Sequence, residues 1–241
     1  MKYEVVDKVL ASECSSLAQL SIIGAVEKIQ DHICEFFGQL NIDQRTLRAK
    51  HNAMWVFTRN KIKFCKPLDW DESVVVRCFI TKITSLTMEI DCAIYNKNNE
   101  VAIYSRVEIC LLDFSSKKIK KIDELCDIKI LNSEMPIIYL EFNKLRAQES
   151  CRQIASVRVG ASCIDFCQHT NNTQYIKFII DCYKVKDLEN LPLKSVEISY
   201  NSQTFESDLL DICCDEKVGE YKYFCIKKDG TTVAKCKFNY C

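Results

Sequence analysis

Residues 165–172 read Asp-Phe-Cys-Gln-His-Thr-Asn-Asn and lead directly into residues 173–181, Thr-Gln-Tyr-Ile-Lys-Phe-Ile-Ile-Asp. From Tyr175 to Cys182, apolar side chains recur every three to four positions, which predicts a helix with one buried face. Asn171 or Asn172 is the expected N-cap residue, since asparagine side chains accept hydrogen bonds from the first free N–H groups of a helix.

The residues ahead of this helix carry reactive side chains. In an extended segment Asp165, Cys167 and His169 would all point to the same side of the chain. A helix N-terminus offers unpaired N–H groups and the positive end of a dipole, both of which favour developing negative charge. A carboxylate, a thiol and an imidazole at such a place predict hydrolysis at a carbonyl group.

Composition excludes several classes of function. Lys+Arg and Asp+Glu both total 33 in 241 residues, and no basic tract interleaved with aromatic residues suggests nucleic-acid binding. Only 5 glycines are present, without a phosphate-binding glycine pattern, so no nucleotide cofactor is expected. The charged N-terminus lacks the apolar core of a signal peptide, and no apolar run would span a membrane. We therefore expect a cytoplasmic protein without membrane insertion.

The 16 cysteines are scattered through the chain, often at positions that read as strand interior. Buried cysteine behaves as a small hydrophobic residue, and a reducing compartment keeps it as a thiol. The spacing of Cys163, Cys167 and His169 does not match the usual zinc patterns, and no Cys-x-x-Cys pair occurs. No structural metal is expected.

The order of elements repeats along the chain. Helices are expected over residues 17–37, capped by Ser15-Ser16 and stopped by Gly38, and over residues 172–184. Strands are expected at 2–12, 53–62, 73–83, 87–95, 101–114, 156–160, 194–203, 206–214, 219–227 and 231–240. Residues 115–135 read as a solvated surface or linker.

Local details support a duplication. Residues 70–75 pair with residues 204–209, and the hairpin at 96–99 pairs with that at 228–230. In each half, a long helix and an antiparallel sheet must bury their apolar faces on each other. The segment ahead of the first helix, residues 11–16, lacks histidine. Only the second half therefore carries the reactive residues, and the first is left to shape a pocket for an apolar ligand.

These features resemble the acyl-acyl carrier protein thioesterases. His169, Asn171 and Asn172, followed by Tyr175, are similar to the signature of that family, as is the Trp-Val-Phe-Thr-Arg-Asn-Lys-Ile run at residues 55–62. The resemblance covers nearly the whole chain. It implies an α+β tandem (double) hotdog, in which each unit is an antiparallel sheet wrapped around a long central helix.

The resemblance also implies domains and partners. Residues 1–135 would form a non-catalytic hotdog with the acyl-chain pocket, 136–150 a linker, and 151–241 the catalytic hotdog. The expected reaction hydrolyses fatty acyl-acyl carrier protein to free fatty acid and carrier protein, ending fatty acid synthesis. The expected partner is acyl carrier protein bearing a fatty acyl phosphopantetheine, and a homodimer is left open. No cofactor is implied.

Two positions depart from the family's pattern. The family has Asn at the position of Cys167. A family segment that ends in a catalytic Glu is similar to residues 196–203, so that Gln203 stands at the position of that Glu. Asp165 would activate water or attack the thioester carbonyl, His169 would position water or donate a proton, and N–H groups near Asn171 and Asn172 would bind the oxyanion.

Other readings stay open. Cys167 could act as a nucleophile paired with His169. Gln203 can orient water but cannot serve as a base. The alternatives to an acyl carrier protein thioesterase are a catalytically degenerate binding module for acyl chains or carrier protein, and a thioesterase acting on acyl-coenzyme A.

Overall fold

A computed structural model of the chain describes residues 3–125, 140–145, 151–190, 193–215 and 221–240. The chain divides into two compact units, Met1–Leu140 and Glu141–Cys241. Within the described residues, no helix is long and apolar enough to cross a membrane.

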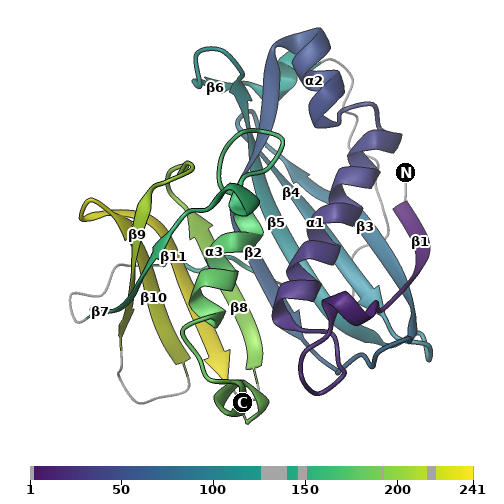
Figure 1. Ribbon diagram of the computed structural model, residues 1–241. Helices are drawn as coiled ribbons and strands as arrows, with labels where there is room; N and C mark the ends of the chain where they lie inside the picture. Colours follow the sequence, from purple (N-terminus) through teal and green to yellow (C-terminus); the bar gives the residue numbers. More distant parts are fainter. Residues whose placement is uncertain (1–2, 126–139, 146–150, 191–192, 216–220, 241) are drawn as a thin grey trace. The chain divides into compact units, whose positions relative to one another are not determined.

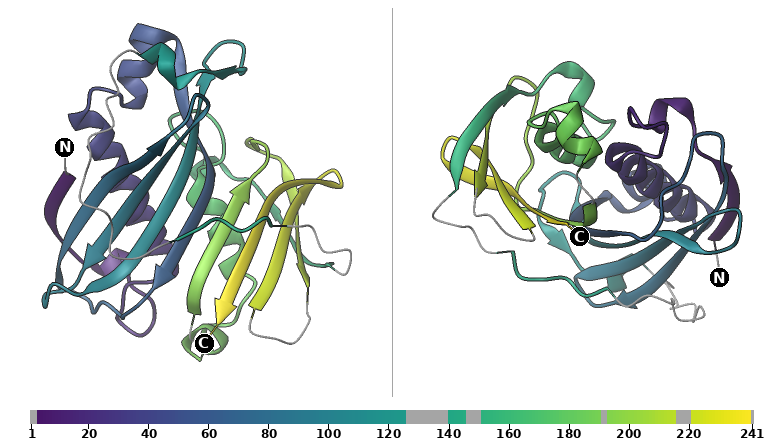
Figure 2. Two further views of the ribbon diagram at one scale, coloured as in Figure 1. Left: turned by 180° about the vertical axis from the view of Figure 1, so that it is seen from behind. Right: turned by 90° about the horizontal axis from the view of Figure 1, so that it is seen from below.

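Unit 1 is an antiparallel sheet that curves around a long helix (Figures 1 and 2). Its strands lie in the order β1-β3-β4-β5-β2, with the short β6 paired to β5. Its elements in chain order are β1 (Tyr3–Lys8), the 3-10 turn η1 (Ala11–Glu13), α1 (Ile22–Gln39), α2 (Gln44–His51), β2 (Ala53–Phe64), β3 (Ser73–Ile83), β4 (Thr87–Tyr95), β5 (Val101–Asp113), β6 (Ile119–Lys120) and η2 (Ile122–Leu125).

Unit 2 repeats this plan. Its strands lie in the order β7-β9-β10-β11-β8, again antiparallel. Its elements are β7 (Arg152–Arg158), η3 (Ala161–Cys163), α3 (Asn172–Ile180), α4 (Val185–Glu189), β8 (Leu193–Tyr200), β9 (Leu209–Asp215), β10 (Tyr221–Lys228) and β11 (Thr231–Tyr240). Because strands and helices follow one another in the same order with the same pairing, the predicted tandem hotdog is confirmed.

The repeat extends to single hydrogen bonds, which correct the predicted match. In unit 1 the Val9 N–H donates to Glu72 O, and in unit 2 the Val159 N–H donates to Asp208 O. This pairing makes Glu72 the counterpart of Asp208. The expected pairing of residues 70–75 with 204–209 is therefore wrong by two residues. It matched similar residue types in the two segments, whereas the equivalent backbone hydrogen bonds align Glu72 with Asp208.

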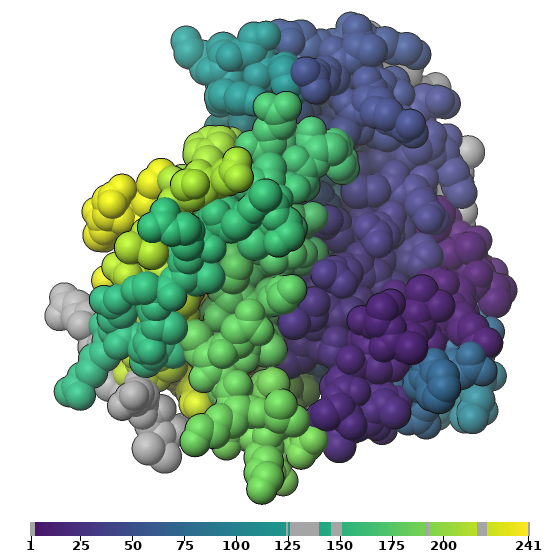
Figure 3. Space-filling view, in the orientation of Figure 1, coloured from purple at the N-terminus to yellow at the C-terminus, as the bar shows by residue number. Residues whose placement is uncertain are grey.

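The core of unit 1 lies between α1 and the sheet. The side chains of Ile29 and Ile33 are fully buried, as are those of Phe36 and Phe37 to within a few per cent. The opposite side of α1 reaches the surface (Figure 3). The helix starts at Ser21, whose Oγ accepts the Gly24 N–H at 2.9 Å, rather than at the predicted cap Ser15-Ser16. It also continues one residue past the predicted stop at Gly38.

Two other helices differ from expectation. The predicted helix 172–184 ends at Ile180, and α4 follows as a separate turn of helix. Tyr183 explains the break, since its ring stacks on Phe238 and its hydroxyl lies 2.9 Å from that of Tyr240, which draws the chain towards β11. Helix α2 was not predicted, although Asp43 caps it by accepting two backbone N–H groups.

Parts of the expected linkers are packed rather than solvated. Ile122 and Leu125 are buried in η2, within the segment 115–135. In the segment 136–150, only residues 140–145 are described. There the Arg106 guanidinium donates to Leu140 O at 2.6 Å, and the Asn143 backbone N–H donates to the buried Glu197 carboxylate at 2.6 Å. Leu140 is thus hydrogen-bonded to unit 1, and Asn143 is hydrogen-bonded to unit 2.

Candidate active site

The stretch ahead of α3 forms a tight turn. The Asp165 N–H donates to His169 O at 3.0 Å, and the Gln168 N–H donates to Asp165 O at 2.9 Å. Gln168 has φ of 65°, in the left-handed region. The expectation of an extended segment is therefore wrong for residues 165–169. The three reactive side chains still converge, because the turn folds their backbone around a common centre.

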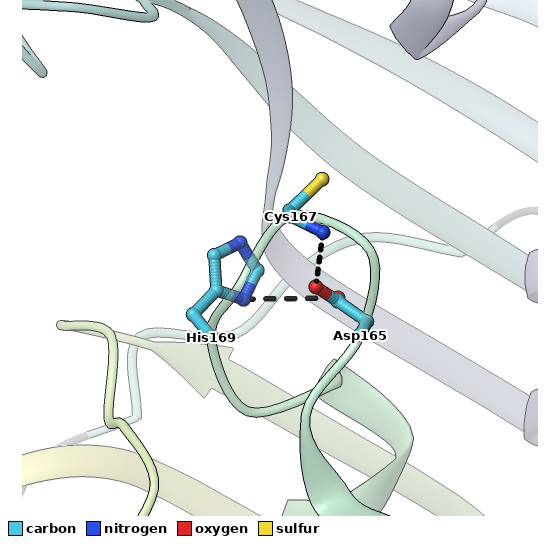
Figure 4. Close-up of side chains that lie close together, drawn as sticks. All are labelled: Asp165, Cys167 and His169. Atoms are coloured by element: carbon cyan, nitrogen blue, oxygen red, sulfur yellow. Dashed lines mark hydrogen bonds and ion pairs between the residues drawn. The ribbon is translucent and has the colours of Figure 1, made fainter.

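Asp165 holds this turn with its side chain. Its Oδ1 accepts the Cys167 N–H at 2.8 Å, while its Oδ2 lies 3.7 Å from His169 Nδ1 (Figure 4). One carboxylate oxygen, one histidine nitrogen and the Cys167 sulfur all lie within 4.8 Å of one another. The carboxylate therefore has one oxygen committed to the backbone and a second directed at the imidazole.

The environment of the pair is largely closed. The side chains of Asp165 and His169 are 17% and 11% exposed. His169 Nδ1 also lies 3.2 Å from Thr170 O. A proton on Nδ1 would be donated to the Thr170 carbonyl, whereas a proton on Nε2 would leave Nδ1 to accept one from Asp165.

A small polar network fixes the turn against the loop after β8. The Thr170 N–H donates to Thr204 O at 2.8 Å, and the two threonine hydroxyls lie 2.7 Å apart. The Tyr175 hydroxyl lies 2.8 Å from Thr204 Oγ1, and burial raises the pKa of Tyr175, so this hydroxyl stays neutral. The sequence pattern indicates Tyr175 but neither threonine, because Thr170 and Thr204 lie 34 residues apart in the chain.

The start of α3 has the expected N-cap, and it leaves fewer backbone N–H groups for an oxyanion than expected. Asn171 is the N-cap: its Oδ1 accepts the Thr173 N–H at 3.0 Å and its carbonyl accepts the Gln174 N–H at 3.0 Å. The Asn171 N–H, however, donates to Cys163 O at 2.9 Å, so it cannot also bind an oxyanion. Among the described residues, the Asn172 N–H has no such acceptor, and it is the remaining backbone candidate.

Gln203 belongs to the loop after β8 that is hydrogen-bonded to this turn. It directly precedes Thr204, whose carbonyl and hydroxyl bind Thr170. Its Nε2 is buried and donates to no group in the described part of the chain. Leaving a buried donor unpaired costs about 1–3 kcal/mol, and such groups call for an explanation such as a ligand or water that supplies the acceptor.

Unit 1 contains the same turn without the reactive side chains. The Ser15 N–H donates to Gln19 O at 2.8 Å, and Ala18 has φ of 55°, as Gln168 does at the equivalent place. Ser15 Oγ accepts the Leu17 N–H at 3.3 Å, which copies the bond from Cys167 to Asp165. Serine, leucine and glutamine thus stand where unit 2 has aspartate, cysteine and histidine.

Comparison with known proteins identifies the family. The model of the acyl-ACP thioesterase N-terminal domain matches residues 7–128, and that of the C-terminal domain matches residues 146–240. The chain belongs to the acyl-ACP thioesterase family. It is therefore a thioester hydrolase acting on acyl groups carried by acyl carrier protein (ACP), and the suspected resemblance is confirmed.

Solved structures show the same fold. An acyl-ACP thioesterase from Bacteroides thetaiotaomicron is similar with a TM-score of 0.89 at 17% identity, over 100% of this chain and 98% of that chain. A 12:0-ACP thioesterase from Umbellularia californica is similar with a TM-score of 0.80 at 14% identity, over 100% of this chain and 97% of that chain. A comparison with curated proteins found no match.

Within the family's two domains, the turn that carries Asp165, Cys167 and His169 falls in the segment matched by the C-terminal domain model. The equivalent turn at Ser15–Gln19 falls in the segment matched by the N-terminal one.

Proposed function

We propose that this thioesterase releases free fatty acid from fatty acyl-ACP at the turn formed by residues 165–169. The observation that carries the proposal is the approach of the Asp165 carboxylate to the His169 imidazole in a largely closed site beside a helix N-terminus. A carboxylate base, a proton carrier and backbone N–H groups are the three parts that hydrolysis of an acyl thioester needs.

Asp165 acts as the base in this proposal. Its Oδ1 is held by the Cys167 N–H, which fixes the orientation of the carboxylate and leaves Oδ2 to accept a proton from water. The hydroxide oxygen then bonds to the thioester carbon, and the carbonyl oxygen takes the negative charge. When the tetrahedral adduct collapses, the carbon–sulfur bond breaks, and the proton returns through His169 to the departing phosphopantetheine sulfur.

The oxyanion needs donors that are in place before the reaction. The Asn172 N–H lies at the first helical position of α3, where the helix dipole adds to its effect. The buried Gln203 Nε2 is a second donor, suited either to the oxyanion or to the attacking water. Loss of one such donor typically lowers kcat by about 10²–10³-fold.

His169→Gln tests the site with little risk to the fold. Gln19 already occupies the equivalent place in the unit 1 turn, so glutamine is compatible with this backbone. Purified full-length protein is assayed for fatty acid release from acyl-ACPs of several chain lengths and from the matching acyl-coenzyme A esters. We expect turnover of acyl-ACP by the wild type and a loss of about 10²–10⁴-fold in the variant, the usual contribution of a positioned acid or base.

The same panel separates the alternatives. Tight binding of acyl-ACP without release of fatty acid by the wild type would refute the proposal in favour of a binding module. Faster release from coenzyme A than from ACP would make coenzyme A esters the substrate. Full turnover by His169→Gln would place the chemistry elsewhere.

The compartment, the acyl-chain pocket and the oligomeric state need tests of their own. The enzyme has to share a compartment with its carrier protein, and we expect this to be the cytoplasm. The assignment of the acyl-chain pocket to the N-terminal unit, and a homodimer, remain predictions. Substitutions along α1 combined with the chain-length panel test the pocket, and light scattering of the purified protein tests the dimer.

A further inference from the structure

The turn at residues 165–169 brings together three different metal-binding atoms. The Cys167 Sγ, a His169 nitrogen and an Asp165 carboxylate oxygen lie within 4.8 Å of one another. With zinc bonds of about 2.0–2.3 Å, a tetrahedral site puts neighbouring donor atoms roughly 3.3–3.7 Å apart. At a maximum of 4.8 Å, the three donor atoms are at most about 1.1–1.5 Å farther apart than such a site requires. Small side-chain rotations are therefore enough to close the set around one ion.

The chemistry of the donors selects the kind of ion. Thiolate, imidazole and carboxylate together are ligands of Zn²⁺, whereas Mg²⁺ and Ca²⁺ take oxygen ligands almost alone. Three protein ligands also leave a fourth position for water, which is typical of sites that exchange their ligand rather than of closed structural sites.

The surroundings of the donors are ordered in the way that metal sites require. The Asp165 carboxylate is held by the Cys167 N–H at 2.8 Å, and His169 Nδ1 lies 3.2 Å from Thr170 O. Metal-binding histidines usually donate their second ring N–H to a carbonyl or carboxylate, which fixes the ring. Thr170 is in turn bonded to Thr204, so the backbone carbonyl that orients the ring is itself fixed.

We propose that this turn reversibly binds one Zn²⁺ ion through Asp165, Cys167 and His169, and that the bound ion stops hydrolysis. Binding itself depends only on the three donors. The inhibition rests on the proposed function, because the metal would occupy the carboxylate and the imidazole that act as base and proton carrier.

Binding is tested first, without any activity measurement. Full-length protein freed of metal with EDTA and then dialysed competes with a chromophoric chelator for Zn²⁺, and Co²⁺ serves as a spectroscopic probe. We expect one ion per chain and a thiolate-to-Co²⁺ charge-transfer absorption. Cys167→Ser should lower Zn²⁺ affinity by at least about 10–100-fold, the loss typical even of residues that merely support a ligand, and abolish that absorption.

Cys163→Ser is the matched control, since Cys163 is a partly exposed cysteine just before the turn and outside the cluster. It should bind Zn²⁺ and Co²⁺ as the wild type does. Equal binding by wild type and Cys167→Ser, or Co²⁺ binding without the charge-transfer absorption, would overturn the site.

Inhibition is tested in the acyl-ACP assay. Zn²⁺ at the concentration that saturates the site should suppress fatty acid release, and EDTA should restore it. Cys167→Asn, measured against its own metal-free rate, should need at least about 10-fold more Zn²⁺ for half inhibition, in line with its weaker ligand set. Stimulation by Zn²⁺, or no effect at saturation, would overturn the inhibitory role.

The two proposals fail separately. A protein that binds Zn²⁺ as described but releases no fatty acid in metal-free buffer contradicts the proposed function and the inhibitory role, and it confirms the metal site. A protein that turns over acyl-ACP but gives no charge-transfer absorption with Co²⁺ contradicts the metal site alone.

Discussion

Asp165→Asn separates the two tasks that the Asp165 side chain performs. Its Oδ1 accepts the Cys167 N–H and so helps to form the turn, while its Oδ2 faces His169 and serves as the proposed base. Asparagine keeps a side-chain oxygen that can accept the same N–H, but it cannot take up a proton from water. The variant should therefore keep the turn and lose the reaction.

The magnitudes follow from this division. A hydrogen bond to a charged acceptor contributes about 1.5–3 kcal/mol and one to a neutral acceptor about 0.5–1.5 kcal/mol, so Asp165→Asn should lower the free energy of unfolding by about 1 kcal/mol. For a chain of this size that corresponds to a Tm lower by about 2–4 °C. Removing the base should reduce kcat/KM by about 10²–10⁴-fold.

The assay measures fatty acid release from acyl-ACP and Tm on the same preparations. Ser15→Ala is the control, since it removes the side-chain acceptor of the equivalent turn in unit 1 and should leave the rate unchanged while costing a similar amount of stability. Asp165→Asn with wild-type turnover would refute the role of the carboxylate. A loss of rate matched by unfolding of the variant at the assay temperature would refute the separation of the two tasks.

Three further outcomes are expected. Cys167→Ala should retain turnover in metal-free buffer, measured with acyl-ACP, and an inactive but folded variant would favour a thiol nucleophile. Gln203→Leu should change the rate but not lower the stability: kcat falls about 10²–10³-fold with the lost donor, while Tm holds or rises because the buried, unpaired Nε2 group is removed. Burial alone would raise the pKa of Asp7, but its hydrogen bonds with Lys28 and His32 outweigh this and hold that pKa below its usual 3.8. The stability that Asp7 provides is therefore complete above about pH 4 and is lost as the pH falls further, so urea titrations should show a weaker acid dependence for Asp7→Asn than for the wild type; parallel curves would contradict this.

The sequence predicted the structure best where a regular alternation of side chains is bounded by polar residues. The predicted strands 73–83 and 87–95 match β3 and β4 to the residue, because alternating side chains and a polar turn define both ends of each. The start of α1 was misplaced because Ser15-Ser16 looks like a cap. The true cap is Ser21, and the preceding residues form a turn around Ala18 that nothing in the sequence reveals.

For the site, the residues were predictable but their backbone was not. Asp165 and His169 do come together, yet through a turn closed by Gln168 in a left-handed conformation rather than through an extended strand. The bond between Thr170 and Thr204 joins segments separated by more than thirty residues, so only the folded chain shows it. The same applies to the unpaired Nε2 of Gln203, since the burial of this atom depends on its surroundings in space rather than on its neighbours in sequence.

The paired turns show how the chemistry of this chain could be extended. Both copies have a side-chain oxygen that accepts a backbone N–H at their first position and a residue with positive φ at their fourth, as Ser15 with Ala18 and Asp165 with Gln168 show. The unit 1 turn therefore already has the backbone conformation of the unit 2 turn, although it lacks the reactive side chains. Writing aspartate at position 15 and histidine at position 19 would ask whether a second catalytic centre can be engineered on a scaffold that already exists.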